Sequence, residues 1–137
     1  MKRSAARTMA MQMLYEAELG GAGGTATLGL VKADLSDAEN MEYIHSTIRG
    51  VLDARQELDA RIARFAQGWT VARMPKVDLC ILRLAVYEML SGLPSGVAIN
   101  EAMELAHAFS SDEASTFING VLGNIARASN KKPETEV

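Results

Sequence analysis

Apolar side chains recur at spacings of three and four residues through most of the chain, which is the period of an amphipathic helix. The first apolar stripe runs from about Ser4 to Leu19 and ends at a cluster of glycines over residues 20–24. The second runs from Met41 to about Ala66. Ser36 and Glu39 precede it with the spacing of a capping box. The pattern therefore predicts helices separated by a weakly patterned, glycine-rich loop.

Gly50 interrupts the second stripe, and glycine costs roughly 1 kcal/mol relative to alanine inside a helix, so we expect a break or kink into two helices there. The next helix begins near Pro75, since proline suits a first turn, and it stops near Gly92. Apolar residues surround most of its circumference. This pattern predicts the central, buried helix of the fold.

Two further stripes complete the pattern, one over Val97 to Phe109 and one behind a second capping box formed by Ser110 and Glu113. The sequence has no strand-like alternation, internal repeat or heptad array. We therefore predict an all-α, compact single-domain helical bundle over residues 1–129. Residues 130–137 are charged and contain a proline, so we expect a disordered tail.

Composition narrows the class of protein further. The chain has 137 residues, 48% of them hydrophobic and only 5% aromatic, which suits one domain with an aliphatic core. Its net charge of -3 excludes general electrostatic attraction to nucleic acid, so any such contact needs a local basic patch. Cys80, the single cysteine, lies in an apolar run and is expected to be a core residue in a reducing compartment. With neither a signal peptide nor a membrane-length apolar run, the protein is expected to be cytoplasmic.

Catalytic and metal-binding patterns are weak. Two Glu-x-x-His pairs have the spacing used by di-iron helical bundles, with Glu16 or Glu18 and Glu88 as nominal further ligands: Glu42 with His45, and Glu104 with His107. However, Glu104 lies away from the apolar stripe of its helix, whereas such ligands must project into the bundle interior. A metal-binding bundle therefore stays a minor alternative. The sequence has no nucleophile elbow or phosphate-binding loop, so we expect no enzymatic activity and no cofactor.

A short basic patch opens the chain. Lys2, Arg3 and Arg7 occur with no acidic residue before Glu16. Arginine can hold phosphates through paired donors, and unstacked RNA bases can stack on aromatic or guanidinium planes. From these residues alone, an ordinary solvated helix start is the simpler interpretation.

Three other residues are candidates for the rim of a protein interface. Tyr15 follows Arg3 and Arg7 along one ridge of the first helix, while Glu113 and Phe117 are i, i+4 neighbours at the edge of the last stripe. A large ring beside a carboxylate suits an interface rim. Phe117 could equally belong to the core, and the pattern alone leaves this open.

Three segments together carry a family resemblance: DLCILRLAVYE at Asp78–Glu88, VAINEAMELA at Val97–Ala106 and FINGVL at Phe117–Leu122. With a weaker match over Arg7–Tyr15, the chain resembles the NusB family of bacterial transcription antitermination factors. It is also similar to the N-terminal domain of a family of RNA cytosine methyltransferases. Those chains continue into a large catalytic domain, whereas this one stops at Val137.

The resemblance implies about seven helices and a role in processive rRNA transcription. NusB proteins bind the boxA element of single-stranded nascent RNA together with the ribosomal protein NusE, in an antitermination complex with RNA polymerase and other Nus factors. The resemblance assigns RNA binding to Lys2, Arg3 and Arg7, and NusE contact to Tyr15, Glu113 and Phe117. We expect these two groups to lie side by side as one docking platform.

The arginine cluster of the family is thinned in this chain to Arg3-Ser4-Ala5-Ala6-Arg7, which implies low RNA affinity for the isolated protein. A protein-only adaptor with little RNA binding is therefore the main alternative function. The sequence also leaves a homodimer open.

Overall fold

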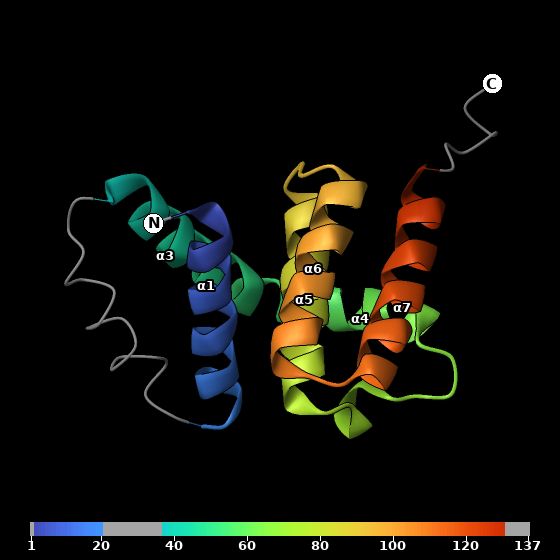
Figure 1. Ribbon diagram of the computed structural model, residues 1–137. Helices are drawn as coiled ribbons and strands as arrows, with labels where there is room; N and C mark the ends of the chain where they lie inside the picture. Colours follow the sequence, from blue (N-terminus) through green and yellow to red (C-terminus); the bar gives the residue numbers. More distant parts are fainter. Residues whose placement is uncertain (1, 21–36, 131–137) are drawn as a thin grey trace.

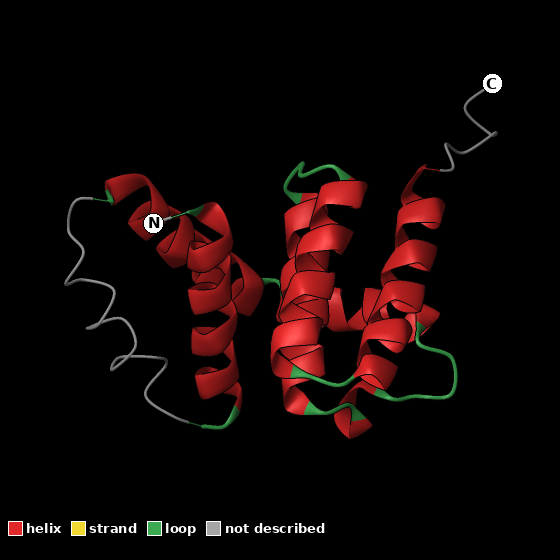
Figure 2. Ribbon diagram, viewed as in Figure 1, coloured by secondary structure: helices red, strands yellow, loops and turns green. Residues whose placement is uncertain are grey.

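Helices make up nearly all of the described part of the chain, residues 2–20 and 37–130 of this computed structural model (Figures 1 and 2). In chain order these elements are α1 (Arg3–Glu18), α3 (Ala38–Asp53), α4 (Arg55–Phe65), the 3-10 helix η1 (Val71–Arg73), α5 (Lys76–Leu90), α6 (Ser95–Phe109) and α7 (Asp112–Asn130). The predicted all-α class is confirmed, although the described residues form six α-helices and not the expected seven. Asn130 belongs to α7, and the rest of the predicted tail lies outside the described residues.

The helix α5 occupies the centre of the bundle, as its apolar pattern predicts. Every residue from Asp78 to Val86 is buried, and the helix packs against α1, α3, α4, α6 and α7. In Figure 1, α5 and α6 stand between the pair α1 and α3 on one side and α7 on the other. Cys80 is 1% exposed, and burial raises the pKa of its thiol to about 12. It is a core residue, as predicted.

The predicted break at Gly50 is wrong, because α3 continues through this residue and the chain breaks at Ala54. The side chain of Tyr87 on α5 lies directly against Gly50, where a β-carbon would overlap its hydroxyl and ring. The glycine therefore permits close approach of two helices and does not end one.

The observed helix caps lie one residue after the predicted serines, and neither forms a capping box. Asp37 caps α3, since its carboxylate accepts a hydrogen bond from the backbone of Asn40 at 3.3 Å, while Ser36 lies outside the described residues. At the start of α7, Ser111 Oγ accepts from the backbone of Ala114 at 3.1 Å. The hydroxyl of Ser110, expected to be the cap, donates instead to Asp78 Oδ1 at 2.6 Å.

Two networks of ion pairs hold α1 antiparallel against α5. Near the start of α1, Arg7 pairs with Glu88 at 2.7 Å. Near its end, Glu18 pairs with Arg83 at 3.0 Å, and Arg83 also contacts Asp59 of α4 at 2.7 Å. These contacts determine which end of α1 lies beside which end of α5. Within the described ranges, no helix is long and apolar enough to cross a membrane.

Candidate functional site

The start of α1 concentrates positive charge. Lys2 occupies the N-cap position without a side-chain hydrogen bond, Arg3 is the first helical residue, and the first turn contains no acidic residue. Both side chains are exposed. Because the backbone N–H groups of a helix start already carry partial positive charge, cations are unfavourable there and anions favourable. The basic residues at the start of α1 are therefore unfavourable for the helix itself, but they favour binding of an anionic ligand there.

Arg7 does not share this exposure, so the interpretation of the basic patch as an ordinary solvated helix start is wrong for this residue. Its side chain is buried between carboxylates, with only 6% of the residue exposed. Nε and Nη2 donate to the two oxygens of Glu88 at 2.7 and 2.9 Å, and Nη1 lies 3.0 Å from Glu101 Oε1. Burial alone lowers the pKa of the Arg7 guanidinium, but its hydrogen bonds and charge interaction with Glu88 outweigh burial and raise it. The guanidinium therefore faces protein carboxylates and not solvent.

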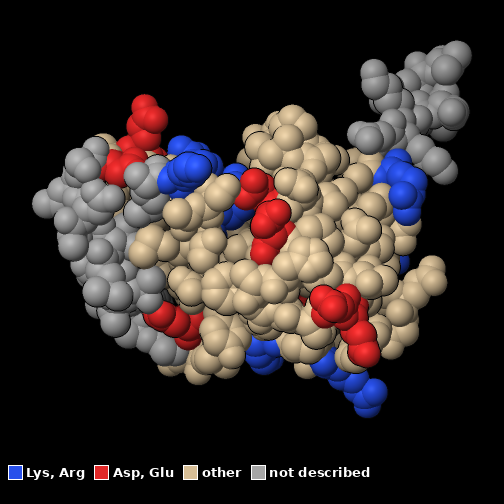
Figure 3. All heavy atoms as spheres, viewed as in Figure 1, with Lys and Arg blue, Asp and Glu red and all other residues tan. Residues whose placement is uncertain are grey.

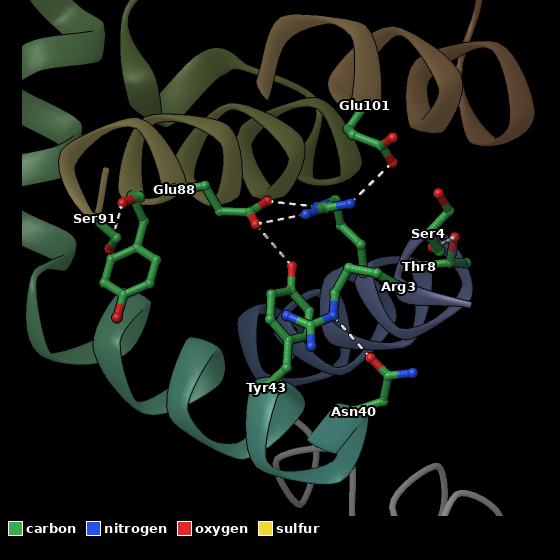
Figure 4. Close-up of polar contacts among 10 residues, drawn as sticks. Arg3, Ser4, Thr8, Asn40, Tyr43, Glu88, Ser91 and Glu101 are labelled. Carbon is green, nitrogen blue, oxygen red and sulfur yellow. Dashed lines mark hydrogen bonds and ion pairs between the residues drawn. The ribbon is translucent and has the colours of Figure 1, made fainter. Parts of the chain in front are cut away.

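Arg3 lies on the outside of the same cluster (Figure 4). Its Nε donates to Asn40 Oδ1 at 2.8 Å, and its Cζ lies 4.3 Å from the centroid of the Tyr43 ring. Among the described residues, the two terminal nitrogens of Arg3 have no hydrogen-bonding partner. Arg3 is thus oriented by α3, and no described residue occupies its two terminal nitrogens.

Tyr43 joins the two arginines. Its hydroxyl donates to Glu88 Oε2 at 3.0 Å, and the Cζ of Arg7 lies 5.5 Å from the ring centroid. Burial, together with the charge of Glu88, raises the pKa of the Tyr43 phenol. Sequence reasoning missed Tyr43 and Asn40. The only signal for Tyr43 was an aromatic residue beside the apolar stripe of its helix.

The three residues predicted at a protein interface lie around the start of α5. Tyr15 lines one hollow together with Met11, Gln12, Val77 and Phe109. Glu113 and Phe117 line a second, with Trp69, Met74, Pro75, Asp78, Ser111 and Ala114. Since Val77 borders the first hollow while Pro75 and Asp78 border the second, the two hollows are neighbours. The structure therefore brings the three predicted residues into one region.

Trp69 belongs to this region although sequence reasoning missed it. It is 49% exposed, and its ring centroid lies 5.9 Å from that of Phe117 in a tilted arrangement. Phe117 itself is half-buried and packs against the core, while its place at the rim of a protein interface stays a prediction. Trp69 is the only tryptophan of the chain and follows Gly68 just after a predicted helix, and this position was the signal for it in the sequence.

The cationic end and the aromatic region do not lie side by side, contrary to expectation. Arg3 and Tyr15 are twelve positions apart on α1, which is about 18 Å at 1.5 Å per residue. In Figure 1 the start of α1 and the start of α7 lie at opposite ends of the bundle. A ligand that reaches both regions must extend along the molecule.

An acidic hollow runs between α1 and α6 next to the cationic end. Ser4, Ala5 and Thr8 line one side, and Asn100, Glu101 and Glu104 line the other. Figure 3 shows basic and acidic side chains close together on this face and no broad basic surface. An anion bound at the start of α1 would therefore lie beside acidic side chains.

The residues considered for a metal site have other roles or stay apart. Glu18 and Glu88, the nominal additional ligands, are paired with Arg83 and Arg7. The part of the chain that the structure describes contains no group of three or more histidine, cysteine, aspartate or glutamate side chains arranged to hold a metal ion.

Comparison with known proteins agrees with the resemblance seen in the sequence. The model of the NusB family matches residues 4–127. The transcription antitermination protein NusB of Acetivibrio thermocellus is 40% identical over 131 residues, which cover 93% of this chain and 90% of that protein. NusB of Saccharopolyspora erythraea is 43% identical over 129 residues, with 90% and 86% coverage.

Solved structures show the same fold. The structure of T. maritima NusB superposes with a TM-score of 0.80 at 27% identity, covering 99% of this chain and 96% of that one. A crystal structure of antitermination factors NusB and NusE in complex with double-stranded RNA contains a chain with a TM-score of 0.78 at 25% identity, covering 92% and 96%. The chain described here belongs to the NusB family of transcription antitermination proteins.

Proposed function

We propose that the protein binds boxA-containing single-stranded RNA together with NusE, and that this joint binding promotes processive rRNA transcription within an antitermination complex containing RNA polymerase and other Nus factors. The RNA part rests on Arg3, which is oriented by Asn40, has terminal nitrogens without a partner among the described residues, and lies at a helix start without an acidic residue in its first turn. The structural neighbour that contains NusB, NusE and RNA supports the choice of partners. The role is one of binding, and no bond is made or broken.

RNA contact is assigned to Lys2 and Arg3, while Arg7 supports them from the interior. Lys2 and Arg3 are exposed, whereas the donors of Arg7 already face Glu88 and Glu101. Breaking these ion pairs to reach an RNA phosphate would leave the buried carboxylate of Glu88 without its cation. Of the three residues that the family resemblance assigns to RNA binding, only Lys2 and Arg3 are therefore proposed to contact RNA directly.

The test of the RNA site is a salt titration. Replacing Lys2 and Arg3 by alanine should weaken binding of boxA RNA and lower the slope of log affinity against log salt by about 0.7 for each RNA phosphate that the variant no longer neutralises. Arg73→Ala is the matched control, because Arg73 is exposed but lies in η1, away from α1. An unchanged slope in the double variant would remove Lys2 and Arg3 from the RNA site.

NusE contact is assigned to the aromatic region around the start of α5. Tyr15, Glu113 and Phe117 line its two hollows, and Trp69 adds an exposed ring. Exposed aromatic side chains with a nearby charge suit the centre and rim of a protein interface.

Glu113→Arg is the sharpest test of this interface, because Glu113 is exposed and the substitution leaves the core intact. It should reduce NusE binding at least tenfold by calorimetry, with an unchanged helical circular dichroism spectrum. Phe117→Asp is expected to abolish NusE binding as well, but it also disturbs packing, since Phe117 is half-buried. If Glu113→Arg and Trp69→Ala both bind NusE normally, the interface is elsewhere.

Joint recognition separates this function from that of a protein-only adaptor. If NusE and RNA bind cooperatively, each must raise the affinity of the other by the same factor. Titration of boxA RNA with and without saturating NusE measures this factor. If the protein were an adaptor without RNA binding, its mixture with NusE would bind boxA RNA with the same affinity as NusE alone.

A further inference from the structure

We propose that Asn40 and Tyr43 of α3 are positioning residues of the RNA site, which hold the guanidinium group of Arg3 ready to bind one RNA phosphate. The inference rests on the proposed function, because it assumes that the start of α1 binds RNA. It adds a second helix to a site that the sequence placed on α1 alone.

The orientation of Asn40 is determined by contacts within α3. Its Nδ2 donates to Asp37 Oδ2 at 2.9 Å, and its backbone N–H donates to Asp37 Oδ1. The amide oxygen therefore points to the other side, where it accepts from Arg3 Nε at 2.8 Å. Asn40 is 6% exposed, so the acceptor is held in place by packing as well as by hydrogen bonds.

The ring of Tyr43 is held in place through its hydroxyl group. Its hydroxyl donates to Glu88, and the carboxylate of Glu88 is held by two hydrogen bonds from Arg7 at 2.7 and 2.9 Å. The ring can then support the Arg3 guanidinium, whose Cζ is 4.3 Å from its centroid, through a cation–π contact. Buried Arg7 thus contributes to the site indirectly, by keeping Glu88 and Tyr43 in place.

These contacts leave Arg3 with one edge for a ligand. Nε is occupied by Asn40 and the plane rests on Tyr43, while the terminal nitrogens have no partner among the described residues. Guanidinium donors match the oxygens of a phosphate in a paired geometry. An exposed arginine normally loses rotational freedom when it binds, and a guanidinium that is already oriented loses less. One oriented arginine can in this way offset part of the thinning of the family's arginine cluster.

The test is a set of double-mutant cycles with fluorescently labelled single-stranded boxA RNA in the absence of NusE. Asn40→Ala and Tyr43→Leu should each weaken binding by about 2- to 10-fold, the effect expected when one side chain is no longer held in its binding orientation. Neither should weaken it further when Arg3 is already alanine. Tyr43→Phe keeps the ring and should bind more tightly than Tyr43→Leu. Ser46→Ala, an exposed position on the same helix, is the matched control.

A measurement without RNA tests the same arrangement. In the free protein, the Nε–H signal of Arg3 in nitrogen-15 relaxation experiments should show an ordered group, and Asn40→Ala should make it mobile while the melting temperature shows that α3 is still folded. A mobile Arg3 in the unmodified protein would overturn the inference.

The outcomes of these experiments distinguish failure of the positioning role from failure of the proposed RNA-binding function. If Arg3→Ala weakens RNA binding but Asn40→Ala and Tyr43→Leu do not, the positioning role is wrong and the RNA site stands. If Asn40→Ala and Tyr43→Leu weaken RNA binding as much in the Arg3→Ala background as in the unmodified protein, they do not act through Arg3 and the inference is again wrong. If Arg3→Ala itself has no effect, the RNA site and the inference fail together.

Discussion

Arg3 and Arg7 lie four positions apart on one helix, yet they have opposite environments. Arg3 is exposed and oriented by Asn40, whereas Arg7 is enclosed by carboxylates of α5 and α6. The spacing of apolar residues along α1 could not show that Glu88, 81 positions away in the chain, would contact Arg7. A signal was present, because an acidic residue within the most apolar helix needs a buried cation as partner.

Removing the Arg7 side-chain charge should destabilise the fold. Arg7→Met leaves Glu88 buried without its cation, which is expected to reduce the free energy of unfolding by about 3–5 kcal/mol. The double variant Arg7→Met, Glu88→Leu should recover a large part of this stability, since it leaves no unpaired buried charge. Urea denaturation followed by circular dichroism measures both.

The matched control is Lys2→Ala, an exposed neighbour whose removal should change the free energy of unfolding by less than about 0.5 kcal/mol. A cost for Arg7→Met as small as that of the control would show that Arg7 is not fixed by its ion pairs. Arg7 would then again be a candidate for direct contact with RNA, as the family resemblance implies.

At the scale of elements, charge order explains why α1 lies antiparallel to α5. Along the chain, α1 has Arg7 before Glu18, and α5 likewise has Arg83 before Glu88, so opposite charges meet only when the two helices run antiparallel. The observed direction pairs Arg7 with Glu88 and Glu18 with Arg83. Turning α1 around would place like charges together in a largely buried layer, at a high electrostatic cost.

Sequence periodicity predicted the helices well because burial of an apolar stripe is a local property of the pattern. The start of α1, the central position of α5 and the extent of α6 differ little from expectation. Contacts between helices were not predictable in this way. Helix propensity alone predicts that Gly50 breaks the helix, whereas its role depends on Tyr87 from another helix. Likewise, Asn40, Tyr43 and Trp69 gain their importance only from neighbours that folding brings to them.

Gly50→Ala tests this role of the glycine. Alanine should stabilise the middle of an exposed helix by about 1 kcal/mol relative to glycine, but here its β-carbon meets the ring of Tyr87. We therefore expect Gly50→Ala to lower the melting temperature. In a Tyr87→Ala background, where the ring is absent, the same substitution should raise it. Stabilisation by Gly50→Ala in both backgrounds would show that Tyr87 moves aside at little cost.

At the scale of the whole molecule, the protein is an acidic protein with a small cationic end. Its net charge is -3, and the acidic hollow between α1 and α6 lies next to the residues assigned to RNA. RNA bound at the start of α1 would be repelled along this hollow, so the acids limit both the affinity and the path of the strand. This arrangement predicts a low net attraction of RNA to the isolated protein. It also makes help from a partner more important.

Glu104→Lys tests this balance of charge. Glu104 is exposed and lines the hollow opposite Ser4 and Thr8, so the substitution removes repulsion near the RNA site without disturbing the core. RNA should bind a few-fold more tightly at low salt. The gain should fade as the screening length shortens from about 10 Å at 0.1 M salt to about 3 Å at 1 M.

Asp53→Lys makes the same change in net charge at the far end of α3, about 20 Å along the helix from Asn40 at 1.5 Å per residue. If attraction depends on net charge alone, both variants should gain equally in titrations against boxA RNA. If RNA binds at the start of α1, Glu104→Lys should gain clearly more. An equal gain would therefore argue against a localised site even if Arg3→Ala weakens binding, because removal of any cation would have that effect.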